Sequence, residues 1–345
     1  MALDILHERG TSIDRQVFTW RDRVQSAHPA PPDDPSTRLR AILLAGVEAS
    51  GHGFFRACAE ANPALRAPLE QLRRVEERQQ RLLVWLDPPD RTPVERSLDF
   101  GQLAIAVTAS LALAEPDPGV ARALRSGLVE DFDHLARYAT LLRRVEGREI
   151  GALTRAHLDL LPGGRGRGPR RDVAPAQPPY DRRRAATATK LNVLTLVAGV
   201  EHAHEYFAAI GPMFSERGAR QMHADISAVE RRQVAQYAAL ADPAETWLER
   251  WLLHEAGEAY NYWSCAETET CPRTRRIWER FLDYELGHVR FVADLFQELE
   301  GRDPAEVLSG PVPEPVRYQE HGDFIREVLS GAHPIDRLAG LRAAG

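Results

Sequence analysis

The chain has 345 residues, of which 43% are hydrophobic and 27% are charged, and its formal net charge at pH 7 is −6. This length predicts two domains of about 150 residues each, and the composition is typical of a globular protein. The acidic balance argues against nucleic acid as a partner, and it favours reading the arginines near residues 165–184 as parts of a solvated loop.

Membrane insertion and secretion are not expected from this sequence. The N-terminus contains acidic residues and no sustained apolar run, and no stretch approaches 18 apolar residues. The three cysteines, Cys58, Cys265 and Cys271, form neither a paired framework nor a C-x-x-C motif. They suit a reducing, cytoplasmic compartment and give no indication of a zinc or rubredoxin-type module.

The expected elements are helices. Residues 1–36 are predicted to form an N-terminal arm, followed by helices near 37–61, 64–86, 93–114 and 118–147, which make a first bundle over 37–150. A linker rich in Pro, Gly and Arg covers 151–186. Helices near 187–210, 215–241, 243–268 and 272–301 make a second bundle over 187–303, and the tail 304–345 contains one short helix near 320–331. Proline and Asp-Pro junctions mark the helix ends, and no useful strand alternation is present, so we predict an all-α fold.

The two sets of helices resemble each other as copies. The stretch from Leu128 aligns with the stretch from Leu282 at a separation of 154 residues, so that Asp131 matches Glu285 and His134 matches His288. Upstream, Glu76-x-x-Gln79 matches Glu230-x-x-Gln233, and the segment ending at Glu48 matches the one ending at Glu201, one residue off. The chain is therefore predicted to be a tandem duplication.

Carboxylates interrupt the apolar stripes of the second set of helices. Each stripe is apolar except near its middle, where it carries Glu201, Glu230, Glu255 or Glu285, and His204 and His288 lie three residues after two of these. Residues three and four apart share a helix face, so these side chains should point into the bundle core. Since burying a carboxylate without a partner costs several kcal/mol, their convergence predicts bound cations, and carboxylates with imidazole suit iron or manganese. The alternative is that some of these helices are rotated and their glutamates are solvated.

On these residues the second half resembles the ferritin-like di-iron carboxylate proteins, and more particularly the rubrerythrins. Bundles of that superfamily carry a lone Glu on two helices and Glu-x-x-His on the other two. The resemblance implies metal ligands at Glu201, Glu255 and Glu285-x-x-His288, and it identifies Glu258 with the extra third-helix Glu of rubrerythrin. The departure is at the second helix, where Glu230-x-x-Gln233 places an amide instead of a histidine. His204 is the candidate replacement.

The first half contains fewer candidate ligands, namely Glu48, Glu76, Asp131 and His134. It has Gly101 opposite Glu255 and Gly51 opposite His204, and using Asp99 or Gln102 instead would need a shift in register. We therefore expect a degenerate copy that supports the other half.

The resemblance implies two irons per chain, with manganese as the alternative metal. The leading hypothesis is a cytoplasmic di-metal oxidoreductase that acts on oxygen, peroxide or a small organic substrate. No catalytic residue is assigned. Two alternatives are an iron-handling protein or ferroxidase, and a non-catalytic helical protein with a structural metal. A redox role implies an external electron donor, and neither nucleic acid nor membrane is an expected partner. A homodimer is compatible with the sequence.

Overall fold

The computed structural model describes residues 3–19, 35–86, 91–161, 176–318 and 321–331. In these ranges the regular structure is helical and no strand occurs, which confirms the all-α prediction. The α-helices are α2 (Pro35–Ala61), α3 (Arg66–Leu86), α4 (Pro93–Ala114), α5 (Pro118–Glu146), α6 (Ala152–Leu158), α7 (Thr187–Ile210), α8 (Arg217–Ala238), α9 (Trp247–Thr268), α10 (Pro272–Glu300) and α11 (Gly322–Gly331). Short 3-10 helices are η1 (Ile13–Arg15), η2 (Pro63–Leu65), η4 (Gly211–Met213) and η5 (Pro304–Glu306).

The predicted helices agree with the observed ones to within a few residues. One helix, α6, lies inside the segment predicted to be the linker, and residues 162–175 of that segment lie outside the described residues. The predicted N-terminal arm contains η1, while its residues 20–34 are not described. The short helix predicted in the tail is α11, and residues 332–345 of the tail lie outside the described ranges.

The helix ends carry matching capping signals in the two halves. At the start of α4, Thr92 Oγ1 accepts a hydrogen bond from the Glu95 backbone N–H at 3.2 Å, and the Glu95 carboxylate accepts one from the Thr92 N–H. Thr246 and Glu249 form the same capping box at the start of α9. Both α5 and α10 end at a glycine with positive φ, a backbone conformation in which a residue with a side chain would be strained. The spacing of these signals agrees with the repeat seen in the sequence.

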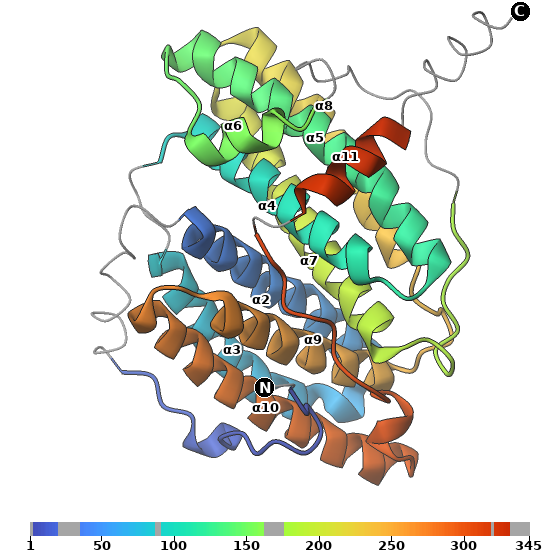
Figure 1. The fold of residues 1–345 in the computed structure, drawn as a ribbon. Coiled ribbons are helices and arrows are strands. Elements are labelled where there is room, and N and C mark those ends of the chain that lie inside the picture. Colours follow the sequence, from blue (N-terminus) through green and yellow to red (C-terminus); the bar gives the residue numbers. More distant parts are fainter. Residues whose placement is uncertain (1–2, 20–34, 87–90, 162–175, 319–320, 332–345) are drawn as a thin grey trace, which may run out of the picture.

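The helices of the two halves do not separate into two bundles along the chain. The hairpin of α2 and α3 lies beside that of α9 and α10, whereas the hairpin of α4 and α5 lies beside that of α7 and α8 (Figure 1). The predicted arrangement, in which residues 37–150 and 187–303 each form their own bundle, is therefore not confirmed. Each half instead gives two helices to each of the two groups.

The hydrophobic core follows this exchange. One part joins α2 and α3 to α9 and α10 through residues such as Phe55, Leu72, Trp251 and Val292. A second part at the other end of these four helices contains Leu44, Leu83, Trp278 and Phe281. The largest part joins α4, α5, α7 and α8, together with one face of α2. Because α2 and α7 contact each other, they form the boundary between the two groups.

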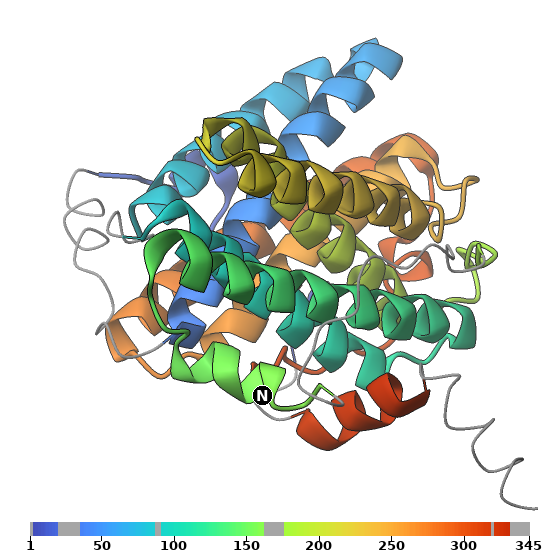
Figure 2. The same cartoon turned by 90° about the horizontal axis from the view of Figure 1, so that it is seen from above.

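Helix α4 is long and apolar enough to cross a membrane by composition, and 78% of its most apolar stretch is buried inside the protein. The sequence analysis found no stretch that approaches 18 apolar residues. That criterion missed α4, whose 18-residue window is apolar on average. Its apolar side chains pack against α5 and α7 in the largest core cluster. Viewed from above, α6 and α11 lie on the outside of this group, against α4 and α5 (Figure 2).

The N-terminal segment lies across α10. Gly10 and Gly287 approach so closely that a Cβ on Gly287 would meet the Thr11 carbonyl oxygen at 2.0 Å, and the Thr11 N–H donates to the Asp283 carbonyl at 3.0 Å. The same segment carries Gln16 to the interior, where it is 6% exposed. This crossing closes one side of the group formed by α2, α3, α9 and α10.

The exchange of helices leads to a test by fragment complementation. Cutting the chain within residues 162–175 gives two fragments, each of which would expose the faces that its helices bury against the other. We expect neither fragment to melt cooperatively alone, whereas the two co-expressed fragments should co-purify and melt as one unit. Circular dichroism and affinity capture through a tag on one fragment measure this. Two fragments that each melt cooperatively as monomers would contradict the observed grouping.

Candidate metal centre

Five carboxylates and one imidazole meet in the interior of the group formed by α2, α3, α9 and α10. They come from all four helices, and each side chain is at most 1% exposed: Glu48, Glu76, Glu255, Glu258, Glu285 and His288. Each helix contributes at least one carboxylate because each has its glutamate in the middle of an apolar stripe. The helix packing that buries the stripes therefore brings the carboxylates together.

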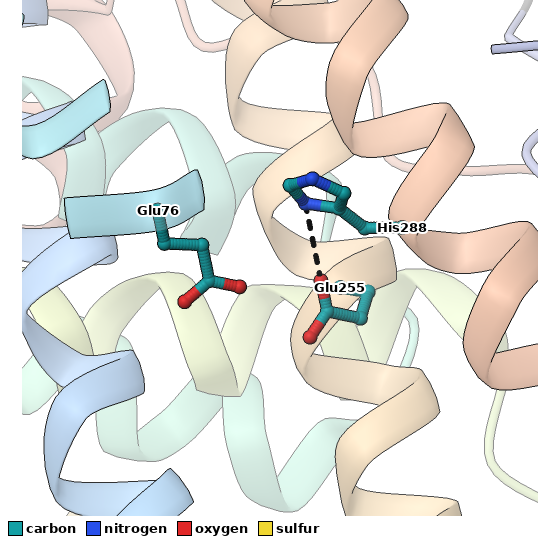
Figure 3. A group of neighbouring side chains, drawn as sticks. All are labelled: Glu76, Glu255 and His288. Atoms are coloured by element: carbon teal, nitrogen blue, oxygen red, sulfur yellow. Dashed lines mark ion pairs between the residues drawn. The ribbon is translucent and has the colours of Figure 1, made fainter. Parts of the chain in front are cut away.

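Two sets of three residues have ligand atoms close enough to hold a cation. Atoms of Glu76, Glu255 and His288 lie within 4.8 Å of one another, and so do atoms of Glu255, Glu258 and Glu285. Figure 3 shows the first set, with Glu76 on α3 facing Glu255 on α9 and His288 on α10. Since Glu255 belongs to both sets, the arrangement has the form of two adjacent cation sites that share one carboxylate.

Neutral donors hold part of the cluster in place. The Gln79 amide donates to Glu48 Oε1 at 3.1 Å and also to Glu285 Oε1. Tyr262 donates its hydroxyl proton to Glu48 Oε1 at 2.5 Å, and the Trp251 indole N–H donates to Glu255 Oε1 at 2.7 Å. These bonds fix the orientation of three carboxylates and leave Oε2 of Glu48 and Oε2 of Glu255 without a hydrogen-bond partner.

Several buried carboxylate oxygens have no hydrogen-bond partner. They are Oε2 of Glu48, both oxygens of Glu76, Oε2 of Glu255 and both oxygens of Glu258. In the part of the chain that the structure describes, no lysine or arginine pairs with them, and the ion pairs present involve His254 and His288. A buried carboxylate without a cation or donor is strongly disfavoured, so the donor set fits a site for cations.

The same surroundings raise the pKa of four of these carboxyl groups well above the usual value of 4.5. Burial is the largest cause for Glu48, Glu76, Glu255 and Glu258 alike. Repulsion from neighbouring carboxylates adds to the effect, with Glu258 acting on the other three. Without a metal, part of this cluster must therefore bind protons to remain in the core.

Gln16 determines which nitrogen of His288 carries a proton. Both N–H groups of the Gln16 amide donate to backbone carbonyls, at 2.9 Å to Thr11 and 3.0 Å to Tyr284. Its Oε1 is therefore the atom that faces His288 Nε2, at 2.9 Å, and it accepts the proton of that nitrogen. In the neutral imidazole this leaves a lone pair on Nδ1.

The Nδ1 atom of His288 faces two carboxylate oxygens, Oε2 of Glu285 at 2.8 Å and Oε2 of Glu255 at 3.7 Å. A lone pair held this close to carboxylate oxygens needs either a metal ion or a proton between the atoms, and a carboxyl group can carry that proton. A second hydrogen bond that fixes the tautomer of an imidazole is common at histidine metal ligands. The Gln16 contact thus gives His288 the tautomer that a ligand needs.

The structure brings together only part of the predicted ligand set. Glu255, Glu258, Glu285 and His288 converge as predicted, and the first half supplies Glu48 and Glu76, which the sequence ranked lower. The remaining residues lie elsewhere, and each departure has a local cause.

Glu230 was predicted to converge with Glu255 and Glu285, and this prediction was wrong. It lies on α8 in the other group of helices, where its Oε1 is 2.9 Å from His134 Nδ1. Gln233, one turn later, donates to Glu130 at 3.3 Å. Because the two halves exchange helices, Glu76 and Gln79 occupy the places in the cluster that the sequence assigned to Glu230 and Gln233.

Glu201 and His204 also lie outside the cluster. Glu201 is half-buried in the wall of a cavity between α2, α7 and α9. The Nδ1 atom of His204 lies 2.9 Å from both the backbone oxygen and the hydroxyl of Ser227, which tie α7 to α8. His204 therefore acts in packing and does not replace a missing ligand at this centre.

The other group of helices contains a smaller polar cluster of Asp131, His134 and Glu230. Thr108 donates to Asp131 Oδ2 at 3.0 Å, and burial, followed by repulsion from Glu230, raises the pKa of Asp131 to about 8. The pKa of His134 is also raised, because the Glu230 hydrogen bond and charge outweigh desolvation. Gly101 matches Glu255 in the alignment of the two halves, so α4 provides no carboxylate at this position. These groups satisfy one another and do not form a set of converging ligands.

Three residues near the centre were not identified from the sequence. Gln79 is recognisable only through its match to Gln233. His254 is not on the stripe that carries Glu255, yet it is 8% exposed and its Nε2 lies 3.3 Å from Glu258 Oε1. Gln16 belongs to the N-terminal arm, where no periodicity marks it.

Comparison of the chain with protein-family models, with curated proteins and with solved structures finds no match. The resemblance to ferritin-like proteins therefore rests on the residues described above.

The raised pKa values predict how pH affects the metal-free protein. Folded carboxyl groups with raised pKa bind more protons than unfolded ones, so the free energy of unfolding should fall as the pH rises above about 4.5, through the folded pKa values. Glu258→Gln removes one of these groups and should stabilise the chelator-treated protein at pH 7 by on the order of 1–3 kcal/mol. Urea unfolding from pH 5 to pH 8 measures both effects.

The matched control is Glu60→Gln, which neutralises an exposed carboxylate on α2 and should change neither quantity. Stability of the metal-free protein that is constant over this pH range, or loss of stability in Glu258→Gln, would contradict the assignment.

Proposed function

We propose that α2, α3, α9 and α10 form a ferritin-like bundle that holds two metal ions, with iron as the expected metal. The observation that carries this proposal is the set of fully buried carboxylate oxygens without partners on Glu48, Glu76, Glu255 and Glu258. On the four helices the ligands follow the pattern of two lone glutamates and two Glu-x-x-His motifs, with Gln79 in place of one histidine. The two halves of the duplication each supply one hairpin of this bundle.

Each ligand has a distinct place in the proposed centre. Glu255 is shared by both sets of ligand atoms and is the candidate bridging carboxylate. Glu76 and His288 complete one set, and Glu258 and Glu285 complete the other. Carboxylate oxygens with a single imidazole make a hard donor set that suits iron or manganese.

Gln79 lowers the number of nitrogen ligands to one and instead donates to two carboxylates. We expect this amide to orient Glu48 and Glu285 and to offset part of their negative charge. The resulting centre is asymmetric, because only the side near His288 has an imidazole.

We propose that the protein is an oxidoreductase acting on oxygen, peroxide or a small organic substrate. A pair of irons held by these residues would supply the redox change for such a reaction. Around it, Tyr262 donates a hydrogen bond to Glu48 Oε1, and burial lowers the pKa of His254, which favours its neutral imidazole. The polypeptide has no electron-transfer module of four cysteines, so the electrons come from an external donor.

Metal content tests the proposal directly. Protein purified under iron-replete conditions should contain about two irons per chain. Glu255→Ala removes the shared carboxylate and should reduce bound iron to near zero, because both sites lose a ligand. Asp131→Asn, which changes a buried carboxyl group in the other group of helices, is the matched control and should retain both irons. Elemental analysis, with absorbance recorded before and after addition of oxygen, gives the readout.

The outcomes separate the candidate functions. Absorbance that changes with oxygen supports the redox role. Bound metal that is redox-silent favours a structural role, and iron far above two per chain favours storage. Absence of bound metal, or equal loss of iron from Glu255→Ala and Asp131→Asn, would contradict the proposed centre.

A second test concerns Gln16 as the residue that positions His288. Gln16→Leu removes the acceptor for the Nε2 proton and should weaken metal binding by about 10- to 100-fold, as loss of such supporting contacts does. Gln16→Glu retains an acceptor oxygen but loses both donors that orient it, so it should restore only part of the affinity. Competition with a chromogenic chelator gives the affinities.

The control for this test is Asp14→Asn, an exposed change on the same segment. Equal affinities of the wild-type protein and Gln16→Leu would show that the N-terminal segment only covers the bundle.

A further inference from the structure

A cavity of about 580 Å³ lies between the two groups of helices. Its walls come from α2, α7 and α9 and from the segment that follows α8, and they are mainly apolar. The residues that give it this character include Val47, Phe54, Leu194, Val197, Ala198 and Leu253. A cavity of this size and composition is typical of a site for a small organic molecule.

The cavity reaches the candidate metal centre. His254 and Glu258 line it, and both also belong to the interior of the bundle, where they lie 3.3 Å apart. Gly51 on α2 leaves room at this place, since a Cβ there would meet His254 Nε2 at 2.8 Å and Glu76 Oε2 at 3.4 Å. A molecule in the cavity would therefore lie next to His254 and next to Glu258, which is one of the proposed metal ligands.

An amide in the cavity wall lacks one hydrogen bond. Asn261 is 1% exposed, and its Nδ2 donates to Thr195 Oγ1 at 2.9 Å and to the Gly257 carbonyl at 2.8 Å. Its Oδ1 is buried and has no partner. Since buried polar atoms are normally paired, this oxygen indicates a ligand that donates a hydrogen bond.

The charged groups of the wall are mostly acidic. Asp242 accepts hydrogen bonds from the Arg182 and Ala244 backbone N–H groups, and Glu245 accepts one from the Tyr180 hydroxyl at 2.8 Å. Arg250 is the arginine of the wall, and it lies 4.0 Å from Glu245.

Glu201 differs from the other acidic groups of the wall. It is half-buried, and neither a hydrogen bond nor an ion pair to it is found among the described residues. Its pKa is raised by burial and by the neighbouring Glu205, with a smaller opposing effect of His204. This carboxylate is accessible and is therefore available to pair with a cation that enters the cavity.

We propose that this cavity binds a small apolar primary amine, with the ammonium group paired with a wall carboxylate at Glu201 and the apolar body packed between α2, α7 and α9. The apolar wall suits the body of this molecule, and the unpaired carboxylate of Glu201 suits its ammonium group. This inference deepens the proposed function and rests on it in one respect: the amine would be the organic substrate of the adjacent metal centre.

Three probes of equal chain length test the chemistry. Isothermal titration calorimetry of chelator-treated protein should show that affinity decreases from n-octylamine to 1-octanol to octanoate. The amine should bind about tenfold more tightly than the alcohol, as a charge-assisted hydrogen bond in a half-buried site would provide. Octanoate should bind most weakly, because the wall is acidic. Equal binding of all three, or preference for octanoate, would overturn the proposal.

Variants locate the binding site. Glu201→Gln should abolish the tenfold preference for the amine over the alcohol, whereas Glu205→Gln, an exposed change one turn away on α7, should leave it intact. Val197→Trp should fill the cavity and weaken both ligands at least tenfold, and its melting temperature shows that it has folded. An unchanged preference in Glu201→Gln would overturn the assignment of the carboxylate. Unchanged affinities in Val197→Trp would overturn the assignment of the cavity.

Manganese as a probe separates this inference from the proposed function. In protein loaded with Mn²⁺, proton relaxation of bound octylamine should be faster than in chelator-treated protein, and Glu255→Ala should remove the difference. Amine binding without a relaxation effect would overturn the link to the metal centre and leave the cavity assignment in place. Normal metal content without amine binding would overturn the cavity assignment and leave the metal centre in place.

Discussion

The desolvation of carboxylates is the constraint on which the rest of this structure depends. Five of them lie in one apolar interior with few donors and with no arginine or lysine paired to them among the described residues. Such an interior is stable only if protons or metal ions balance the charge. The surrounding contacts are consistent with the second solution: Gln79, Tyr262 and Trp251 each fix one oxygen of a carboxylate, and Gln16 leaves Nδ1 of His288 facing the interior. Donors that fully saturated the carboxylates would leave no atoms for a cation.

The exchange of helices between the two halves explains why one centre is rich in ligands and the other is not. The group of α2, α3, α9 and α10 combines the carboxylates of two different copies, whereas the group of α4, α5, α7 and α8 receives Gly101 and a histidine that bonds to Ser227. The same exchange places α2 and α7 side by side, and the cavity lies at this boundary. Glu201, which matches Glu48 in the sequence alignment of the two halves, thereby lines the cavity and not the buried carboxylate cluster.

Helix positions, and the four cluster residues Glu255, Glu258, Glu285 and His288, could be predicted from the sequence, because both depend on local periodicity and on caps such as Thr92 and Thr246. The pairing of the helices could not. Glu48 and Glu201 match each other in the repeat, as do Glu76 and Glu230, so the apolar stripes fit either partner hairpin equally well at the level of residue type. Which hairpins associate depends on the packing of whole faces and on the connections between them. Gln16 and His254 were missed for a related reason, since their roles arise from contacts distant in the chain.

The exchange also fixes when the centre can be completed during synthesis of the chain. The hydrogen bond between Tyr262 and Glu48 spans 214 residues, and α10 follows nearly all the other helices. The nascent chain therefore carries the glutamates of α2 and α3 through most of its synthesis before α9 and α10 emerge. Contacts of such long sequence separation form slowly, and exposed apolar faces favour misassociation in the interval. Loading of the proposed metal ions would thus be a late event, after α9 and α10 have been synthesised.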